Sequence, residues 1–140
     1  MKVFFDSSAF AKRYIQEAGT PEVLLWCDRA SELALSVIAV PELIAAFNRL
    51  LREGRLSEAQ YRQLKGDLMS DIADAFICDT SPQVIQKAID ALEAQPLRGM
   101  DAIHIGAAVL CQAEAFISAD ARQCDAARHL GLQVVAVKAA

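Results

Sequence analysis

Short apolar runs alternate with segments of helical spacing along the whole chain. Runs rich in β-branched and aromatic residues predict about five strands, at 2–5, 33–37, 75–78, 115–118 and 133–137. Apolar residues at helical spacing predict helices over 8–16, 20–31, 39–53, 57–74, 81–95, 101–113 and 120–131. This alternation is typical of an α/β fold in which helices cover both faces of a mostly parallel sheet. We therefore predict a single three-layer domain over residues 1–140.

Several helix boundaries are marked by residues that prefer such positions. Thr20-Pro21 and Ser81-Pro82 each combine an N-cap residue with a proline in the first turn. Gly54 and Gly131 follow helical stripes, at positions where glycine commonly ends a helix. We expect the helices to begin and end close to these residues.

The composition fits one folded core and gives no overall attraction to nucleic acid. Hydrophobic residues make up 54% of the 140 positions, which excludes disordered and low-complexity classes. The 14 Lys and Arg against 18 Asp and Glu give a net charge of -4. A contact with nucleic acid must therefore be local or depend on a metal ion.

The four cysteines, Cys27, Cys78, Cys111 and Cys124, lack the spacing of a zinc site or a disulfide framework. Each lies in an apolar stretch, so we expect reduced core thiols and a cytoplasmic protein. The acid at position 6 comes too early for a signal peptide, and no apolar run approaches the ~20 residues of a membrane span. We expect neither export by that route nor a membrane partner.

Two acidic residues follow predicted strands, and two more lie near the start of predicted helices. Asp6 comes directly after the first strand, and Asp120 follows the fourth strand after one residue. Glu42 and Asp101 lie in first turns of helices. In open α/β sheets the functional crevice lies outside the carboxyl ends of the strands, so we expect all four side chains at one edge of the sheet.

A group of four carboxylates favours a bound cation. Two unit charges about 4 Å apart repel by roughly 4 kcal/mol at an effective dielectric constant of about 20. Oxygen ligands favour Mg²⁺ or Mn²⁺ over zinc, and Mg²⁺ is commonly held by a few carboxylates together with phosphate oxygens. Such a site can activate water and neutralise a phosphodiester, so the pattern favours a substrate that carries phosphate.

Each acid also has an ordinary structural explanation. Glu42 and Asp101 are first-turn acids that complement the helix dipole, and Asp120 is a good N-cap residue. Asp6 fits a turn, although a carboxylate directly behind an apolar strand is costly unless it is solvated or bound. Only the four acids together favour a functional site.

A histidine and a basic segment are further candidates. His104 follows Asp101 by three residues, which suits a metal ligand or a general base, but no second histidine is near and we prefer a structural histidine. Arg49, Arg52 and Arg55 belong to a basic stretch that is either a solvated helix face or a surface that holds RNA. The aromatic residues have core-like spacing and do not form a base-stacking pattern.

Four segments around these acids carry a resemblance to a known family. They read VFFDSSAFAKRYIQE, SVIAVPELIAAFNR, MDAIHIGAAVL and FISADARQCDAARHLGLQVV. Over nearly the whole chain they resemble the PIN-domain nucleases, in particular the toxin ribonucleases of VapBC toxin–antitoxin pairs. The resemblance implies a PIN-like fold and an endoribonuclease that depends on Mg²⁺ or Mn²⁺.

The same resemblance implies partners and residue roles. The partners are an RNA substrate, a cognate antitoxin laid across an apolar groove between the early helices, and a second copy of the chain in a homodimer. The small polar residue after the first acid, often Thr in that family, is Ser7 here. The implied catalytic and metal-binding residues are Asp6, Glu42, Asp101 and Asp120, supported by Ser118.

Three other functions fit part of the sequence. A stand-alone RNA-processing nuclease would use the same acids. A phosphoacceptor receiver domain would use Asp6, Asp79, Ser118 and Lys138, but it leaves the two helix-borne acids unused and expects a second acid beside the first. A degenerate nuclease fold that only binds is disfavoured because all four acids are present.

Overall fold

The computed structural model describes the whole chain, residues 1–140. Its strands are β1 Lys2–Phe5, β2 Glu32–Ser36, β3 Phe76–Cys78, β4 Ala115–Ser118 and β5 Val134–Ala136. Its helices are α1 Ser7–Phe10, the 3-10 helix η1 Ala11–Arg13, α2 Thr20–Arg29, α3 Ala39–Arg52, α4 Glu58–Asp74, α5 Pro82–Ala94, α6 Gly99–Leu110 and α7 Ala121–His129. None of these helices is both long and apolar enough to cross a membrane.

The strands form one sheet in the order β3-β2-β1-β4-β5, and every neighbouring pair is parallel. The predicted parallel α/β sheet is therefore confirmed. The chain order reverses between β1 and β4, because β2 and β3 lie on one side of β1 and the later strands lie on the other. Such a reversal leaves a crevice at the carboxyl ends of two adjacent strands, where ligands commonly bind.

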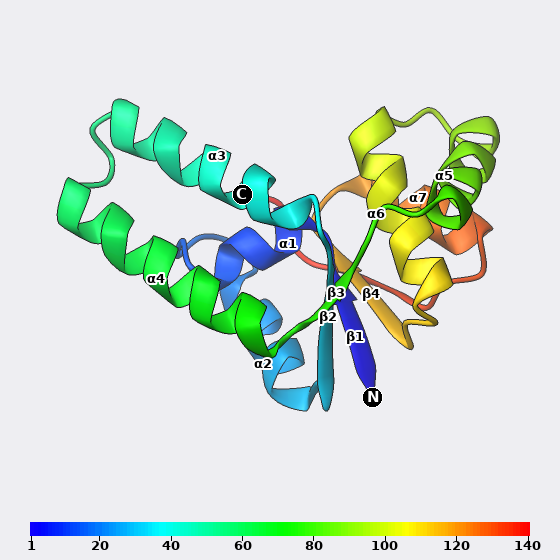
Figure 1. The fold of residues 1–140 in the computed structure, drawn as a ribbon, viewed down its shortest axis with the longest axis horizontal. Helices are drawn as coiled ribbons and strands as arrows, with labels where there is room; N and C mark the ends of the chain where they lie inside the picture. The colour runs from blue at the N-terminus through cyan, green and yellow to red at the C-terminus, as the bar shows by residue number, and fades with distance from the viewer.

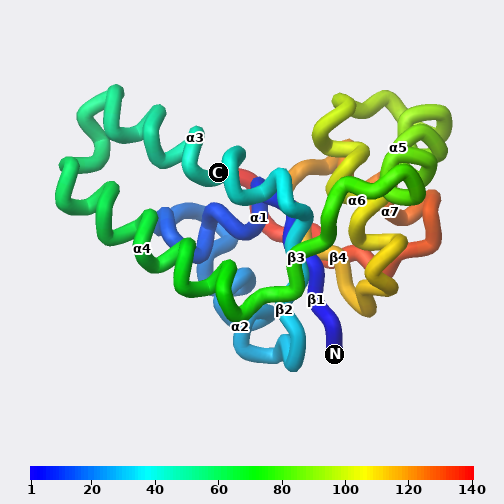
Figure 2. The backbone as a smooth tube through the Cα atoms, in the orientation of Figure 1, coloured from blue at the N-terminus to red at the C-terminus, as the bar shows by residue number.

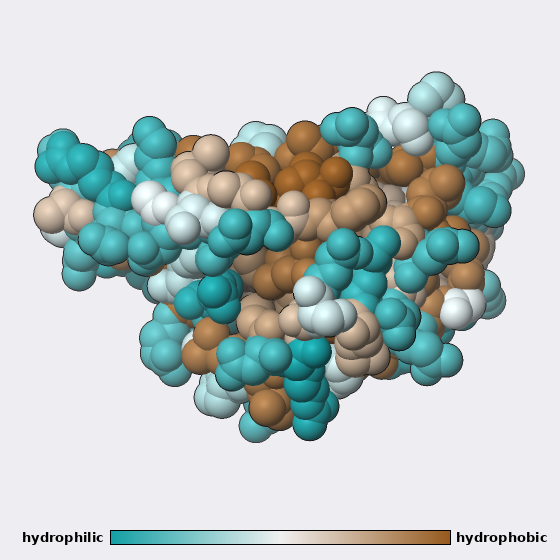
Figure 3. Space-filling model, turned by 60° about the horizontal axis from the view of Figure 1, so that its bottom comes forward, coloured by the Kyte–Doolittle hydropathy of each residue, from teal (hydrophilic) through white to brown (hydrophobic).

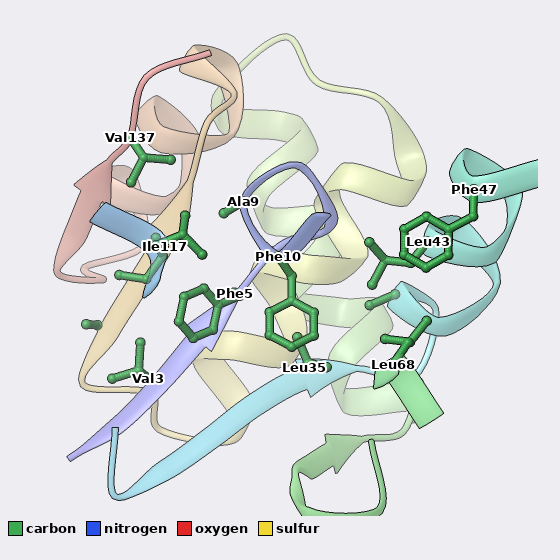
Figure 4. Packing of buried hydrophobic residues seen from close by; sticks show 13 residues of the cluster. Val3, Phe5, Ala9, Phe10, Leu35, Leu43, Phe47, Leu68, Ile117 and Val137 are labelled. Carbon is green, nitrogen blue, oxygen red and sulfur yellow. The ribbon is translucent and has the colours of Figure 1, made fainter. Parts of the chain in front are cut away.

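Helices cover both faces of the sheet, which gives the domain three layers (Figure 1). Alternate residues of β1 point to opposite faces. Val3 and Phe5 pack with residues of α1, α2, α3 and α4, whereas Phe4 packs with residues of α5, α6 and α7. Figure 4 shows the first of these clusters, in which the Phe5 and Phe10 ring centroids lie 5.5 Å apart.

Helices α3 and α4 form a hairpin that extends beyond the sheet (Figures 1 and 2). A capping box begins α4, because the Gln60 amide donates to the Ser57 hydroxyl and the Ser57 amide donates to the Gln60 side chain. Near the other end of α4, the Asp71 carboxylate accepts hydrogen bonds from Arg13 and Tyr14. These hydrogen bonds attach the C-terminal part of α4 to the segment around η1.

The predicted helix over 8–16 is too long. Only Ser7–Phe10 is α-helical, and the chain continues as the 3-10 helix η1. The cause is a contact with the loop that follows, since the buried Lys12 ammonium donates to the Ala18 carbonyl and the Glu17 carboxylate. These contacts favour a turn toward α2 over a longer α-helix, so the α-helix does not reach residue 16.

The start of α2 also differs from the prediction. The sequence predicts Thr20 as the N-cap, but Gly19, with φ of 91°, occupies that position. The Thr20 hydroxyl instead donates to the Lys12 carbonyl at 2.9 Å and so fastens η1 to α2. Gly54 and Gly131 have φ of 73° and 84°, as expected for glycines that end helices.

Gly106 allows α5 and α6 to approach closely. A Cβ atom at this position would lie 2.5 Å from the Val84 carbonyl oxygen and 3.1 Å from the Ala88 amide nitrogen. Both are backbone atoms, so neither can rotate away. The contact fixes the placement of α6, which carries Asp101 and His104.

We predict that Gly106→Ala lowers the free energy of unfolding by about 1–3 kcal/mol, because the added methyl group forces α5 and α6 apart. Gly66→Ala in α4 is the matched control, since open space surrounds that position. Alanine there should raise stability by roughly 0.5–1 kcal/mol through its higher helix propensity. Urea denaturation followed by circular dichroism measures both, and a Gly106→Ala protein as stable as wild type would contradict the tight packing.

Candidate active site

The four predicted acids lie at the carboxyl edge of the sheet, around the reversal between β1 and β4. Asp6 follows β1, and Asp120 follows β4 after one residue. Glu42 lies in the first turn of α3 and Asp101 in the first turn of α6. The parallel sheet thus brings residues from distant parts of the chain to one place.

Asp6 is fully buried beneath this edge. Its Oδ1 accepts from the Ala9 amide at 2.9 Å, and its Oδ2 accepts from the Ser118 hydroxyl at 2.5 Å. The Ser8 hydroxyl lies 2.8 and 2.9 Å from the two oxygens. Burial raises the pKa of Asp6 above its ordinary value, although these hydrogen bonds act in the opposite direction. Asp6 is both the N-cap of α1 and the most deeply placed acid of the site.

In Asp120 and in Asp101, one carboxylate oxygen accepts hydrogen bonds from the protein and the other has no protein donor. Asp120 Oδ1 accepts from the amides of Arg122 and Gln123 at 2.9 and 3.1 Å, which makes Asp120 the N-cap of α7. Asp101 Oδ2 lies 3.3 Å from Nε of Arg98, whose side chain is exposed. The structural explanation for Asp120 is therefore correct, and it still leaves Oδ2 available.

Glu42 follows the same pattern. Its Oε1 accepts from the Ser7 hydroxyl at 2.7 Å and lies 2.6 Å from Nε2 of His104, whereas Oε2 has no protein donor. Burial by itself would raise the pKa of Glu42, but the hydrogen bonds from His104 and Ser7 outweigh burial and hold the pKa below its ordinary value. Glu42 is therefore an ionised carboxylate with one fixed and one free oxygen.

Each pair among Glu42, Asp101 and Asp120 lines a shared open cavity. A cavity of about 440 Å³ is lined by Asp101 and Asp120. A second, of about 570 Å³, is lined by Glu42 and Asp120, and a third, of about 540 Å³, by Glu42 and Asp101. The three acids that keep a free oxygen therefore border one region of the surface.

The chemistry of these donors fits a hard divalent cation. No three His, Cys, Asp or Glu side chains lie close enough together to hold an ion as they stand, so the tight cluster of four carboxylates expected from the sequence is not present. Mg²⁺ keeps several water ligands and needs only one or two carboxylates, however. Three acids that each offer a free oxygen meet that requirement, and they suit Mg²⁺ or Mn²⁺ better than zinc.

His104 lies in this site, although the sequence favoured a purely structural histidine. It is buried, as a structural histidine would be, but its polar contacts are the Glu42 carboxylate and, at 3.3 Å, the Ser7 hydroxyl. The signal in the sequence was its spacing of three residues from Asp101, which places both on neighbouring positions of α6.

The three arginines predicted to hold RNA are all exposed, but they differ in position. Arg49 and Arg55 line the cavity that also contains Glu42 and Asp120. Arg52 does not line that cavity. Two of the three arginines therefore share a cavity with two of the acids.

Neither a protein-family model nor a curated protein sequence matches the chain. Solved structures do match it. FitAcB from Neisseria gonorrhoeae has a TM-score of 0.70 and 15% identity, covering 94% of this chain and 95% of that chain. VapC20 from Mycobacterium tuberculosis, described as a sarcin–ricin loop cleaving toxin, has a TM-score of 0.67 and 15% identity, covering 97% and 98%. A toxin–antitoxin complex from Klebsiella pneumoniae has a TM-score of 0.68 and 15% identity, covering 95% of each chain.

At 15% identity these likenesses establish the fold. They confirm the three-layer PIN-like architecture and, at the level of the fold, the resemblance to toxin proteins that the four sequence segments indicate. Over nearly its whole length, this chain has the fold that FitAcB and the VapC20 toxin share.

Proposed function

We propose that this chain is an endoribonuclease that depends on Mg²⁺ or Mn²⁺ and acts in the cytoplasm as the toxin of a toxin–antitoxin pair. One observation carries the proposal: Glu42, Asp101 and Asp120 border one region at the strand-order reversal, and each keeps a carboxylate oxygen without a protein donor. RNA is the favoured substrate because a protein of the same fold is described as cleaving the sarcin–ricin loop.

Each acid has a defined role in this proposal. Glu42, Asp101 and Asp120 would hold the ion through their free oxygens. Asp6 would join them when the Ser8 hydroxyl, which bonds both Asp6 oxygens, turns toward the cavity that Ser8 lines. A bound ion would supply an activated water and neutralise charge on the scissile phosphate. Ser118 would keep Asp6 in place from the neighbouring strand.

The sheet order favours this proposal over a receiver domain. A receiver would bring Asp6 and Asp79 together, but Asp79 follows the edge strand β3, and β2 separates β3 from β1. A stand-alone RNA-processing nuclease would use the same chemistry as the toxin. A small upstream reading frame that encodes a DNA-binding antitoxin would distinguish the toxin from it.

We predict that the purified protein cleaves RNA with Mg²⁺ or Mn²⁺ and that EDTA abolishes cleavage. Asp6→Asn should lower the cleavage rate on the order of 10²-fold or more, because the site loses a charge while the Asn side chain can still cap α1. Asp79→Asn, at the same edge of the sheet but outside the site, is the matched control and should cleave normally. Undiminished cleavage in excess EDTA, or no cleavage of any RNA in a broad panel, would contradict the proposal.

We further predict that Arg49 and Arg55 hold the phosphate backbone of RNA. In an Asp6→Asn background that prevents cleavage, replacing both with Ala should lower the slope of log affinity against log salt by about 1.4, since each lost contact with a single strand contributes about 0.7. Arg52→Ala should have a smaller effect, because Arg52 lies outside the shared cavity. Fluorescence anisotropy at several salt concentrations measures the slope, and an unchanged slope in the double variant would leave these arginines as surface solubilisers.

Apolar atoms gather near the middle of the face shown in Figure 3. Exposed apolar patches commonly mark interfaces. Two apolar surfaces of the chain suit the partners that the proposal includes. The groove between α4 and the segment that follows η1, about 300 Å³ and lined by Tyr14, Ile15 and Leu64, suits an antitoxin segment. The face formed by α5 and the start of α6, where Ile89 and Met100 are exposed, suits a second copy of the chain.

Light scattering tests the homodimer directly. Ile89→Asp should convert a dimer to a monomer, because a charge would then lie inside an apolar interface. Leu25→Asp on α2 changes an apolar residue that is at least as exposed, on the other side of the sheet, and should leave the dimer intact. A wild-type protein that stays monomeric over a wide concentration range would remove the dimer from the proposal.

A further inference from the structure

We propose that His104 is a positioning residue, which together with Ser7 fixes the Glu42 carboxylate so that Oε2 is left for a metal ion. The inference rests on the proposed function and names a part of the site that the four acids alone do not define. His104 would not touch the ion, because Nε2 is occupied by the contact with Glu42 and Nδ1 is buried.

The geometry around Glu42 is asymmetric. Both nearby donors reach the same oxygen, since Ser7 Oγ lies 2.7 Å and His104 Nε2 lies 2.6 Å from Oε1. The two donors come from α1 and α6, which pack on opposite faces of the sheet, so the carboxylate is held from two directions. Rotation of Glu42 about its last bond would break both hydrogen bonds, and Oε2 is therefore the oxygen that remains free.

Burial makes His104 suited to this role. Its side chain is 1% exposed, whereas that of Glu42 is 32% exposed. A buried ring cannot swing away, so it can hold the more mobile carboxylate in one orientation. Its Nδ1 is buried without any hydrogen-bond partner, which means that the contacts at Nε2 account for all of its hydrogen bonding.

The arrangement does not match a serine nucleophile activated by histidine. In such a relay the serine and the acid bond opposite nitrogens of the imidazole. Here Ser7 and Glu42 both lie at Nε2, at 3.3 and 2.6 Å, and Nδ1 has no acid beside it. The three side chains therefore form a clamp on Glu42.

Metal affinity measured without RNA tests this directly. The probe is Mn²⁺, titrated into the full-length protein and followed by electron paramagnetic resonance of the free ion. His104→Leu has a similar volume and no donor, and it should weaken Mn²⁺ binding by about 10- to 100-fold. His104→Gln places an amide donor near the position of Nε2 and should restore most of the affinity.

A double variant separates positioning from general destabilisation. If His104 acts through Glu42, then His104→Leu should change Mn²⁺ affinity no further once Glu42→Gln is present. Equal loss in both backgrounds would show a structural effect and overturn the inference. Circular dichroism confirms that each variant is folded.

Ser7 provides a second test that does not depend on a buried side chain. Ser7→Ala should weaken Mn²⁺ binding, and Ser7→Thr, which keeps the hydroxyl, should not. Wild-type affinity in both Ser7→Ala and His104→Leu would overturn the inference while leaving the proposed nuclease intact. A wild-type protein that binds no Mn²⁺ at millimolar concentration would overturn both.

Discussion

The parallel pairing of β1 with β4 is the constraint on which the rest of the site depends. It aligns Phe5 with Ile117, and the Asp6 amide continues the pairing by donating to the Ile117 carbonyl at 3.1 Å. The next side chain of β4, Ser118, then meets the Asp6 carboxylate at 2.5 Å. A buried acid needs such donors, because an unpaired charge in an apolar layer is very costly. The strand register therefore supplies the hydrogen bond that makes a buried acid at this edge tolerable.

The structural roles of these acids do not use all of their carboxylate oxygens. Asp6 and Asp120 are N-caps of α1 and α7, and a cap needs only one carboxylate oxygen. In Asp120 the second oxygen has no protein donor, and Glu42 is likewise held through one oxygen. An acid fixed in this way loses little further conformational freedom when it binds an ion. A capping role is thus compatible with the proposed metal-binding role and does not argue against it.

The local pattern of the chain predicted the strands, the layers and the edge that carries the acids, because periodicity reports which face of each element is buried. It did not predict the end of the α-helix at Phe10, because helical periodicity does not report the contacts of the Lys12 ammonium with the loop that follows. It also did not predict His104 as a neighbour of Glu42, since that contact depends on how α6 is rotated and how closely Gly106 lets it approach α5. Spacing along one helix cannot give the distance to a residue on another.

Two consecutive serines connect the separate parts of the site. Ser7 donates to Glu42 on α3, and Ser8 donates to Asp6 after β1. The Ser8 hydroxyl also accepts from the Ala119 amide after β4, at 3.1 Å. Since one short helix carries both hydroxyls, a shift of α1 would disturb both carboxylates at once. The first turn after β1 therefore couples the buried Asp6 to the partly exposed Glu42, and the geometry of the site depends on α1 as much as on the acids themselves.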